Sequence, residues 1–589
     1  MKFSQHLARW LKDSNFSTCF FVAGGNNMHL LNSFRGAFNC IPVIHEVTAA
    51  IASEYFNQHS ETGRSFVLLT AGPGLTNAIT GIAGAWLDSR PLLVIGGQVK
   101  STDLADNGLR QRGIQEIGGV EIVKSITKAA VVLRGPISHS EFKKLVQEID
   151  GPRPGPVFIE ICLDAQGAEV EADPVIGISQ TKNLDVPITL SSSTQDLKTV
   201  AALFNSSKRP VLLLGGGVPR PWARENQELL DDLNIPIQLT WNGADRYGSE
   251  RPLWFGRPDT WGMRFANQII QQSDLLIAVG ARLGLQQTGF NWKEFVPHGN
   301  VVHVCNDLAE LEKGHPKTAV KLNLDAVEFL NWLASLPTNI RPEWLSYCKK
   351  LKNLLPLSEA CNSFHPGFLN PFQFVLALSD LCTPEDRIVP CSSGGANTVM
   401  MQTFLNKTGQ VFFNNRALAS MGYGLAGAIG AAVASPNSRI VLTEGDGGFA
   451  QNLQDLGTLE IRNLNVKVFL FENDGYASIR MTQRNHFNGA YVGCDRSTGL
   501  GFPEWTQLAR SFGIPSLVLD SGFGESTDFL HLWDSYGPAV FRVPVHPEQT
   551  YYPKITSQVL SDGSMMSAPL HRMSPNLDKS VSALVTKFL

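Results

Sequence analysis

The sequence predicts an α/β protein made of three doubly wound domains, each built on a parallel sheet. Three segments, 1–170, 194–340 and 368–550, alternate short apolar runs with stretches of helical periodicity. Glycine-rich turns follow several of these runs, as at 215–217. Strands that alternate with helices are typical of parallel sheets covered by helices on both faces. Residues 551–589 form a polar, weakly patterned tail.

The expected strands are short and apolar, and helical patterns or turns lie between them. In chain order, we expect strands at 20–23, 65–70, 92–95, 157–161, 210–214, 275–279, 301–304, 387–390, 439–442, 466–471 and 539–543. A helix is expected at 46–55, and another opens the second segment. The stretches 165–193 and 341–368 read as linkers between the three segments.

Composition excludes several classes of protein. The chain has 589 residues, a net charge of −4 and 17% charged residues, so it lacks the basic field of a nucleic-acid-binding protein. Its charged fraction lies below the ~25% of an ordinary soluble domain, which favours large areas buried between domains or subunits. Nine cysteines without a CxxC pair argue against a disulfide framework or a zinc site.

The sequence also carries no sign of export or of a membrane span. The N-terminus has the pattern of an amphipathic helix and lacks the apolar core of a signal peptide. The longest run of small apolar residues, 422–434, is shorter than the ~20 residues that a membrane span requires. We therefore expect a cytoplasmic protein with no membrane partner.

The strongest motif lies between two expected strands of the third segment. Gly445-Asp446-Gly447-Gly448 follows the strand 439–442, and Asn473 follows the next one, 27 residues after Asp446. Ligands of open parallel sheets bind beyond the carboxyl ends of the strands, so these two side chains should be neighbours. Mg²⁺ prefers oxygen ligands and usually keeps phosphate oxygens among them. Asp446, Asn473 and the carbonyl of Gly475 could supply such ligands, although Asp-Gly on its own is also a common turn.

Residues 439–487 resemble thiamine diphosphate-dependent enzymes, in particular the large catalytic subunit of acetolactate synthases. The family usually has two asparagines at the second site, and here the first position is Glu472. The resemblance implies a pyrimidine-binding first domain, a central nucleotide-binding-like domain and a diphosphate-binding third domain. In the third domain it implies these cofactor contacts: Gly394, Met421, Gly445, Asp446, Gly447, Gly448, Asn473 and Tyr476.

In the first segment the resemblance assigns the catalytic carboxylate to Glu46. This residue would contact N1′ of the cofactor's aminopyrimidine and relay a proton there, while the alternative is an ordinary glutamate at a helix start. Gly25 and Gln115 are the implied residues near the reacting carbon, and Lys128 is a weaker candidate. The turn at Gly72, Pro73 and Asn77 is implied to hold the pyrimidine half.

The middle segment has two strand-to-turn motifs, at 210–220 and 273–284. Alone they are weak dinucleotide signals. Because they resemble the central domain of acetolactate synthase, they leave two alternatives open, namely a bound FAD or a purely structural domain. Arg264, Gly280, Arg282 and Asp307 are the candidate contacts.

The resemblance implies a carboligase that decarboxylates a 2-oxo acid, with pyruvate expected, and transfers the aldehyde unit to a carbonyl acceptor. The segment after Asn473 lacks the family's usual tryptophan; Arg480, Gln483, Arg484 and His486 could instead face an anionic or sugar-like acceptor. Acetyl transfer to a keto-sugar nucleotide, and a simple decarboxylase or lyase, therefore remain alternatives, as does a catalytically silent binding protein. The family's site lies between subunits, which implies a homodimer or homotetramer.

Overall fold

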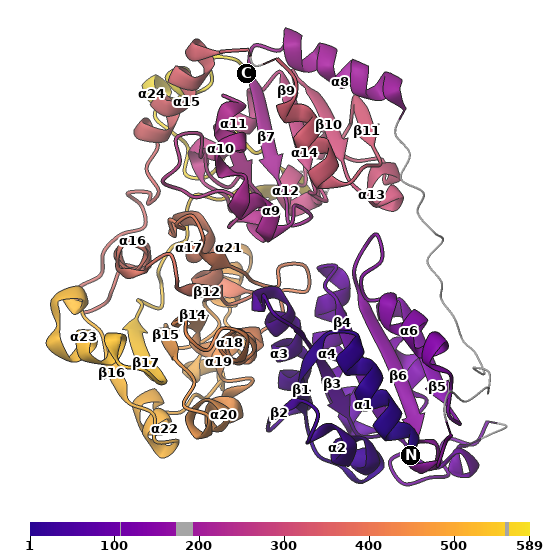
Figure 1. The fold of residues 1–589 in the computed structure, drawn as a ribbon. Coiled ribbons are helices and arrows are strands. Elements are labelled where there is room, and N and C mark those ends of the chain that lie inside the picture. The colour runs from indigo at the N-terminus through magenta and orange to yellow at the C-terminus, as the bar shows by residue number, and fades with distance from the viewer. Residues whose placement is uncertain (106–107, 172–192, 338, 560–564) are drawn as a thin grey trace.

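The computed structural model describes residues 1–105, 108–171, 193–337, 339–559 and 565–589 (Figure 1). Three parallel sheets, each flanked by helices, follow one another along the chain. The predicted fold class is therefore confirmed. Figure 1 shows the first body in indigo and purple, the second in magenta and pink, and the third in orange.

The first sheet has the strand order β2-β1-β3-β4-β6-β5, and every pair in it is parallel. Its strands are β1 (Phe16–Phe21), β2 (Asn39–Pro42), β3 (Arg64–Leu69), β4 (Leu92–Gln98), β5 (Ala129–Leu133) and β6 (Pro156–Cys162). Its helices are α1 (Phe3–Asp13), α2 (Met28–Phe34), α3 (Glu46–His59), α4 (Pro73–Leu87), α5 (Gly119–Val123), α6 (His139–Gln147) and α7 (Leu163–Gly167).

The second sheet has the order β11-β10-β9-β7-β8. Leu212, Leu213 and Leu214 of β7 are all fully buried, as expected for a strand covered on both faces. Its strands are β7 (Pro210–Leu214), β8 (Ile237–Leu239), β9 (Leu275–Val279), β10 (Asn300–Val304) and β11 (Val320–Leu322). Its helices are α8 (Thr194–Ser206), α9 (Arg220–Glu225), α10 (Gln227–Asp232), α11 (Arg264–Gln271), α12 (Leu285–Thr288), α13 (Leu308–Glu312), α14 (Ala326–Ala334) and α15 (Pro342–Leu354).

The third sheet has the order β13-β12-β14-β15-β17-β16. Its strands are β12 (Arg387–Pro390), β13 (Val411–Phe412), β14 (Ile440–Gly445), β15 (Val466–Glu472), β16 (Ser516–Val518) and β17 (Ala539–Pro544). Its helices are α16 (Pro371–Leu381), α17 (Gly394–Thr403), α18 (Tyr423–Ala434), α19 (Asp446–Phe449), α20 (Leu456–Ile461), α21 (Ala477–His486), α22 (Trp505–Ser511) and α23 (Thr527–Asp534).

The tail returns from the third sheet to the second (Figure 1). Strands β18 (Ser557–Val559) and β19 (Met565–Ser567) form an antiparallel pair before α24 (Lys579–Val585). Leu570 and Val585 are buried in the core of the second sheet. Arg264 of α11 fixes this return, since its guanidinium donates to the carbonyls of Met573 and Pro575.

The first and third bodies meet through α3 and α18. Small residues permit the close approach: a Cβ on Gly427 would lie 2.6 Å from the Tyr55 ring, and one on Gly430 would lie 2.1 Å from the Ala52 carbonyl. Asp455 adds a polar link, because its carboxylate accepts hydrogen bonds from the backbone amide of Ile44 and the hydroxyl of Thr48.

Candidate active site

The two strand tips that carry Asp446 and Asn473 are adjacent. β14 and β15 pair in parallel, with Gly445 opposite Phe471. Asp446 is 1% exposed, and its carboxylate accepts the backbone amides of Gly447, Asn473 and Gly475 at 2.8, 3.1 and 3.2 Å. One carboxylate thus joins both tips. Burial raises its pKa to about 7, so a bound cation would favour the ionised form.

The second tip presents one side-chain oxygen that is available to a ligand. Oδ1 of Asn473 is buried and has no hydrogen-bond partner among the described residues. Buried polar atoms are normally paired, so this atom suits a ligand. Among the described residues, no group of three or more His, Cys, Asp or Glu could hold a metal. The donor set of one carboxylate, one amide oxygen and the Gly475 carbonyl fits Mg²⁺ bound together with phosphate oxygens.

Glu472 does not take part in this donor set. Its two carboxylate oxygens accept Nε and Nη2 of Arg542 at 2.9 and 3.0 Å. A bidentate pair of this kind holds the side chain firmly. The family's usual asparagine is thus replaced by a residue that is engaged in an ion pair.

The glycine turn after β14 leaves room for a bulky anion. A Cβ on Gly447 would lie 2.4 Å from the ring of Tyr476, so only glycine fits there, whereas one on Gly445 would meet open space. Gly394, at the start of α17, has φ +80° and also borders open space. Gly445 is the last residue of β14 and Gly394 follows β12, so both glycines lie at the carboxyl edge of the same sheet.

Met421 lies two residues before the first residue of α18. Its side chain is 37% exposed, which is unusual for a large apolar group beside a buried core. Gly422, in the left-handed conformation with φ +83°, begins the helix, and Asn452 holds its carbonyl at 2.6 Å. The loop therefore presents an apolar side chain next to the Asp446 turn.

The first sheet assembles a second group of candidates. Glu46 begins α3, is 8% exposed and accepts Nδ2 of Asn77 at 3.0 Å. Gly72, with φ +64°, begins the turn into α4, and a Cβ there would lie 2.4 Å from the Gln115 carbonyl. Pro73 is the first residue of that helix. The structure thus brings Glu46, Asn77, Gly72 and Gln115 to one edge of the sheet.

The two remaining candidates of the first segment, Gly25 and Lys128, lie at opposite edges of the first sheet. Gly25, in a short 3₁₀ turn (Gly25–Asn27), is exposed and borders open space. Lys128 precedes β5 and is buried against Gly151 and Gly155. It therefore lies at the amino edge of the sheet, away from the other candidates, and has a structural role.

Within the described part of one chain, the candidates on the first sheet and those on the third sheet are not bonded to one another. Among the described residues, no hydrogen bond or ion pair links Glu46, Gly72 or Gln115 to Met421, Asp446 or Asn473. Gln115, Gly25 and Met421 are exposed, so each group reaches the surface of the chain although Glu46 and Asp446 are buried.

Helix α21 contradicts one expectation, namely that Arg480 could face an acceptor. Arg480 is 3% exposed, and its guanidinium donates to the carbonyls of Asn473, Asp474 and Pro547 at 3.2, 2.8 and 2.9 Å. It also pairs with Asp495 at 3.4 Å. Arg480 thus braces the loop that carries Asn473 and Gly475, a role that the sequence pattern did not reveal. Arg484 pairs with Glu548, and Gln483 and His486 lie on more exposed positions.

We expect Arg480→Met to weaken Mg²⁺ binding by roughly 10- to 100-fold, the usual effect of losing an outer-shell contact. The measurement is the Mg²⁺ dependence of the melting temperature in the presence of cofactor. Arg484→Met, one turn further along α21, is the matched control and should change the Mg²⁺ requirement less than about twofold. Equal values for both variants would show that Arg480 does not position the loop.

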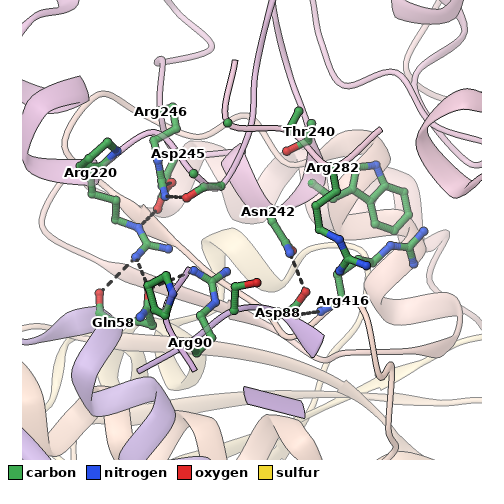
Figure 2. Close-up of a pocket in the computed structure, with 18 of the residues that line it drawn as sticks. Gln58, Asp88, Arg90, Arg220, Thr240, Asn242, Asp245, Arg246, Arg282 and Arg416 are labelled. Atoms are coloured by element: carbon green, nitrogen blue, oxygen red, sulfur yellow. Dashed lines mark hydrogen bonds and ion pairs between the residues drawn. The ribbon is translucent and has the colours of Figure 1, made fainter. Parts of the chain in front are cut away.

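A cavity of about 1140 Å³ lies where the three bodies meet, and Figure 2 shows its polar lining. Gly280, Arg282 and Asp307 line it, but Arg264 does not, because it holds the tail. Asp307 is already engaged: its carboxylate accepts two backbone amides at the start of α13 and pairs with Arg153.

The fold and this site define a class, that of three-domain α/β enzymes whose cofactor site lies at the carboxyl edges of parallel sheets. Comparison with known proteins gives the family. The models of the thiamine pyrophosphate enzyme N-terminal TPP binding domain, central domain and C-terminal TPP binding domain match residues 1–122, 197–333 and 393–549, respectively. The chain belongs to the thiamine pyrophosphate (thiamine diphosphate) enzymes.

Its relatives lie in the acetolactate synthase branch. The acetolactate synthase isozyme 1 large subunit of Escherichia coli (strain K12) is 30% identical, with 82% of this chain and 83% of that protein covered. The acetolactate synthase large subunit of Cyanidium caldarium is 29% identical, with 87% of each chain covered. The isozyme 2 large subunit of Escherichia coli (strain K12) is 27% identical over 94% of this chain and 97% of its own. The protein is therefore a thiamine diphosphate-dependent, acetolactate synthase-like enzyme.

No helix in the described part of the chain combines the length and the apolar character that crossing a bilayer demands.

Proposed function

We propose that this protein is a Mg²⁺-dependent carboligase that decarboxylates a 2-oxo acid, pyruvate in the first place, and transfers the activated aldehyde unit to a carbonyl acceptor. The observation that carries the proposal is the unpartnered Oδ1 of Asn473 beside the Asp446 carboxylate. These oxygens, with the Gly475 carbonyl, would hold Mg²⁺ and through it the cofactor's diphosphate.

When bound, thiamine diphosphate supplies the carbanion that adds to the donor carbonyl and the electron sink for decarboxylation. The chain's own residues hold and orient it. Glu46 would hold a proton against N1′ of the aminopyrimidine, with Asn77 fixing the carboxylate that does so.

The names of the relatives and the residues of helix α21 favour different acceptors. The printed names of the relatives favour acetolactate synthesis. Helix α21 favours a more polar acceptor, because it carries no tryptophan and its His486 is exposed. Acetyl transfer to a keto-sugar nucleotide is therefore our second candidate, and simple decarboxylation the third.

A second copy of the chain would complete the site. The Glu46 group and the Asp446 group are not bonded to one another within one chain, and residues of both are exposed. A homodimer in which the first domain of one copy faces the third domain of the other would bring them together, and a homotetramer would contain two such pairs.

The central cavity has two proposed uses. Its volume and the two glycine turns beside it support a nucleotide such as FAD. The engagement of Asp307 with Arg153 and with α13 supports the alternative, a domain that serves only the architecture.

Products formed from pyruvate test the reaction. We expect the purified enzyme with thiamine diphosphate and Mg²⁺ to release CO₂ from pyruvate and to form a longer ketol when an acceptor is present. The acceptors to compare are a second pyruvate, small aldehydes and a keto-sugar nucleotide. Acetaldehyde as the main product with every acceptor would replace the carboligase by a decarboxylase, and absence of turnover with all of them would reject both.

A further inference from the structure

Most of the arginines that line the cavity between the three bodies are paired with a carboxylate there, and one is not. Seven arginines and six carboxylates line it. Six of these arginines pair with one of those carboxylates; they are Arg153, Arg220, Arg224, Arg246, Arg282 and Arg416. Arg90 is the exception, since it has no ion pair within the part of the chain that the structure describes.

Arg90 is also deeply buried. Only 6% of the residue is exposed, and burial lowers the pKa of its guanidinium. Among the described residues, its side chain makes one hydrogen bond, from Nη1 to the neutral amide oxygen of Gln58 at 3.2 Å, and its Nε has no partner. A buried charge without a counter-charge is unfavourable, so this guanidinium lacks an anion.

The nearby carboxyl groups of Asp88 and Glu54 do not supply the missing counter-charge. Asp88 attracts Arg90 from a distance, but its two oxygens accept the Asn242 side chain and the backbone amide of Arg416. Burial raises the pKa of Glu54 to about 8, so this side chain is largely neutral at pH 7. The charge of Arg90 is therefore not compensated by a direct contact.

A second arginine, Arg220, donates to the same oxygen of Gln58. Nη1 of Arg220 donates to Oε1 of Gln58 at 3.1 Å, and its Nη2 is buried with no partner in the described part of the chain. Both guanidinium groups lie over the ring of Phe413, at 4.6 Å for Arg90 and 5.1 Å for Arg220. Figure 2 shows the two groups reaching Gln58 from opposite walls, one from the first body and one from the second. Two guanidinium groups therefore share one neutral oxygen, and within the described residues each keeps one buried N–H group without a partner.

We propose that Arg90 and Arg220 bind an oxyanion, a phosphate or carboxylate group, beside Gln58 at the junction of the three domains. This group is either a free anion that acts as an effector or the charged part of a nucleotide that occupies the same cavity. In both cases the anion ties the first and second bodies together through the two guanidinium groups, with Phe413 of the third body beneath them. The proposal does not depend on the reaction catalysed.

The test measures binding by calorimetry and by the melting temperature, with thiamine diphosphate and Mg²⁺ saturating so that the cofactor site is closed to the probes. The probes are inorganic phosphate, malonate, ADP and FAD at constant ionic strength. Ligands carried through purification are first identified by mass spectrometry after denaturation. We expect at least one probe to bind and to raise the melting temperature. A response to phosphate or malonate identifies a free anion, and a response confined to ADP or FAD identifies a nucleotide. No response to any probe, with no ligand carried over, would overturn the proposal.

Three variants locate the site. Arg90→Met should weaken the responding probe at least tenfold, whereas Arg224→Met, an exposed arginine paired with Glu61 at the same cavity, should not. Gln58→Glu places a carboxylate at the point of convergence, so it should raise the melting temperature without ligand and abolish the response. If Arg90→Met does not fold, Gln58→Glu decides: a lower melting temperature or an undiminished response rejects the site. The response should persist in Asp446→Ala, which separates this site from the cofactor site.

Discussion

Replacing Glu46 with glutamine is expected to lower the turnover number by roughly 10²- to 10⁴-fold, the usual contribution of a positioned proton donor or acceptor. Glutamine has the same shape and can still accept the hydrogen bond from Asn77. It cannot hold a transferable proton. The affinity for thiamine diphosphate should therefore change little, while the rate of cofactor C2 proton exchange and the rate of product formation fall together.

A buried glutamate on the same helix provides the control. Glu54 accepts hydrogen bonds from Asn415 and Tyr423, and burial raises its pKa to about 8. At pH 7 Glu54→Gln exchanges one neutral group for another, so turnover should stay within a few-fold of the parent enzyme. If Glu46→Gln kept the parent turnover, or if both variants lost it equally, Glu46 would have no part in the mechanism.

Replacing Asp446 with alanine is expected to weaken Mg²⁺ and thiamine diphosphate together, by more than the ~10- to 100-fold typical of an outer-shell change. The carboxylate has two functions in the structure. It is the only charged group in the proposed donor set, and it pairs three backbone amides that join the two strand tips. Calorimetric titration of each ligand at saturating concentration of the other measures the effect.

Two companion variants separate binding from folding. Alanine leaves buried amides unpaired, at about 1–3 kcal/mol each, so part of the loss could come from the loop itself. Asp446→Asn keeps an acceptor oxygen and removes the charge; it should fold like the parent and still bind Mg²⁺ poorly. Asp474→Asn, on an exposed residue of the same loop, should leave both affinities unchanged. Unaltered titrations with Asp446→Ala would remove Asp446 from the metal site.

Much of the architecture follows from local pattern. Strands such as β7 and β9 are continuous apolar runs because helices cover both of their faces, and that pattern predicts them directly. The short edge strands β8, β11, β13 and β16 were not predicted. Each is only two or three residues long and is fixed by pairing with a neighbour rather than by its own sequence.

The candidate site was likewise predicted in part from the sequence, and the rest became visible only in the structure. The sequence alone determined that oxygen-bearing side chains stand at two successive strand ends, because the order of strand, glycine turn, helix and strand dictates where Asp446 and Asn473 fall. It could not reveal that Glu472 is bound by Arg542 or that Arg480 braces the loop of Asn473 and Gly475, since those partners lie far apart in the chain or depend on loop geometry.

The tertiary structure alone decided which charges remain without a partner. Arg90, Gln58, Arg220 and Phe413 come from three bodies and share no sequence pattern, so their convergence exists only after the domains have packed. Local periodicity encodes which face of an element is buried, and it carries no information about contacts between residues hundreds of positions apart.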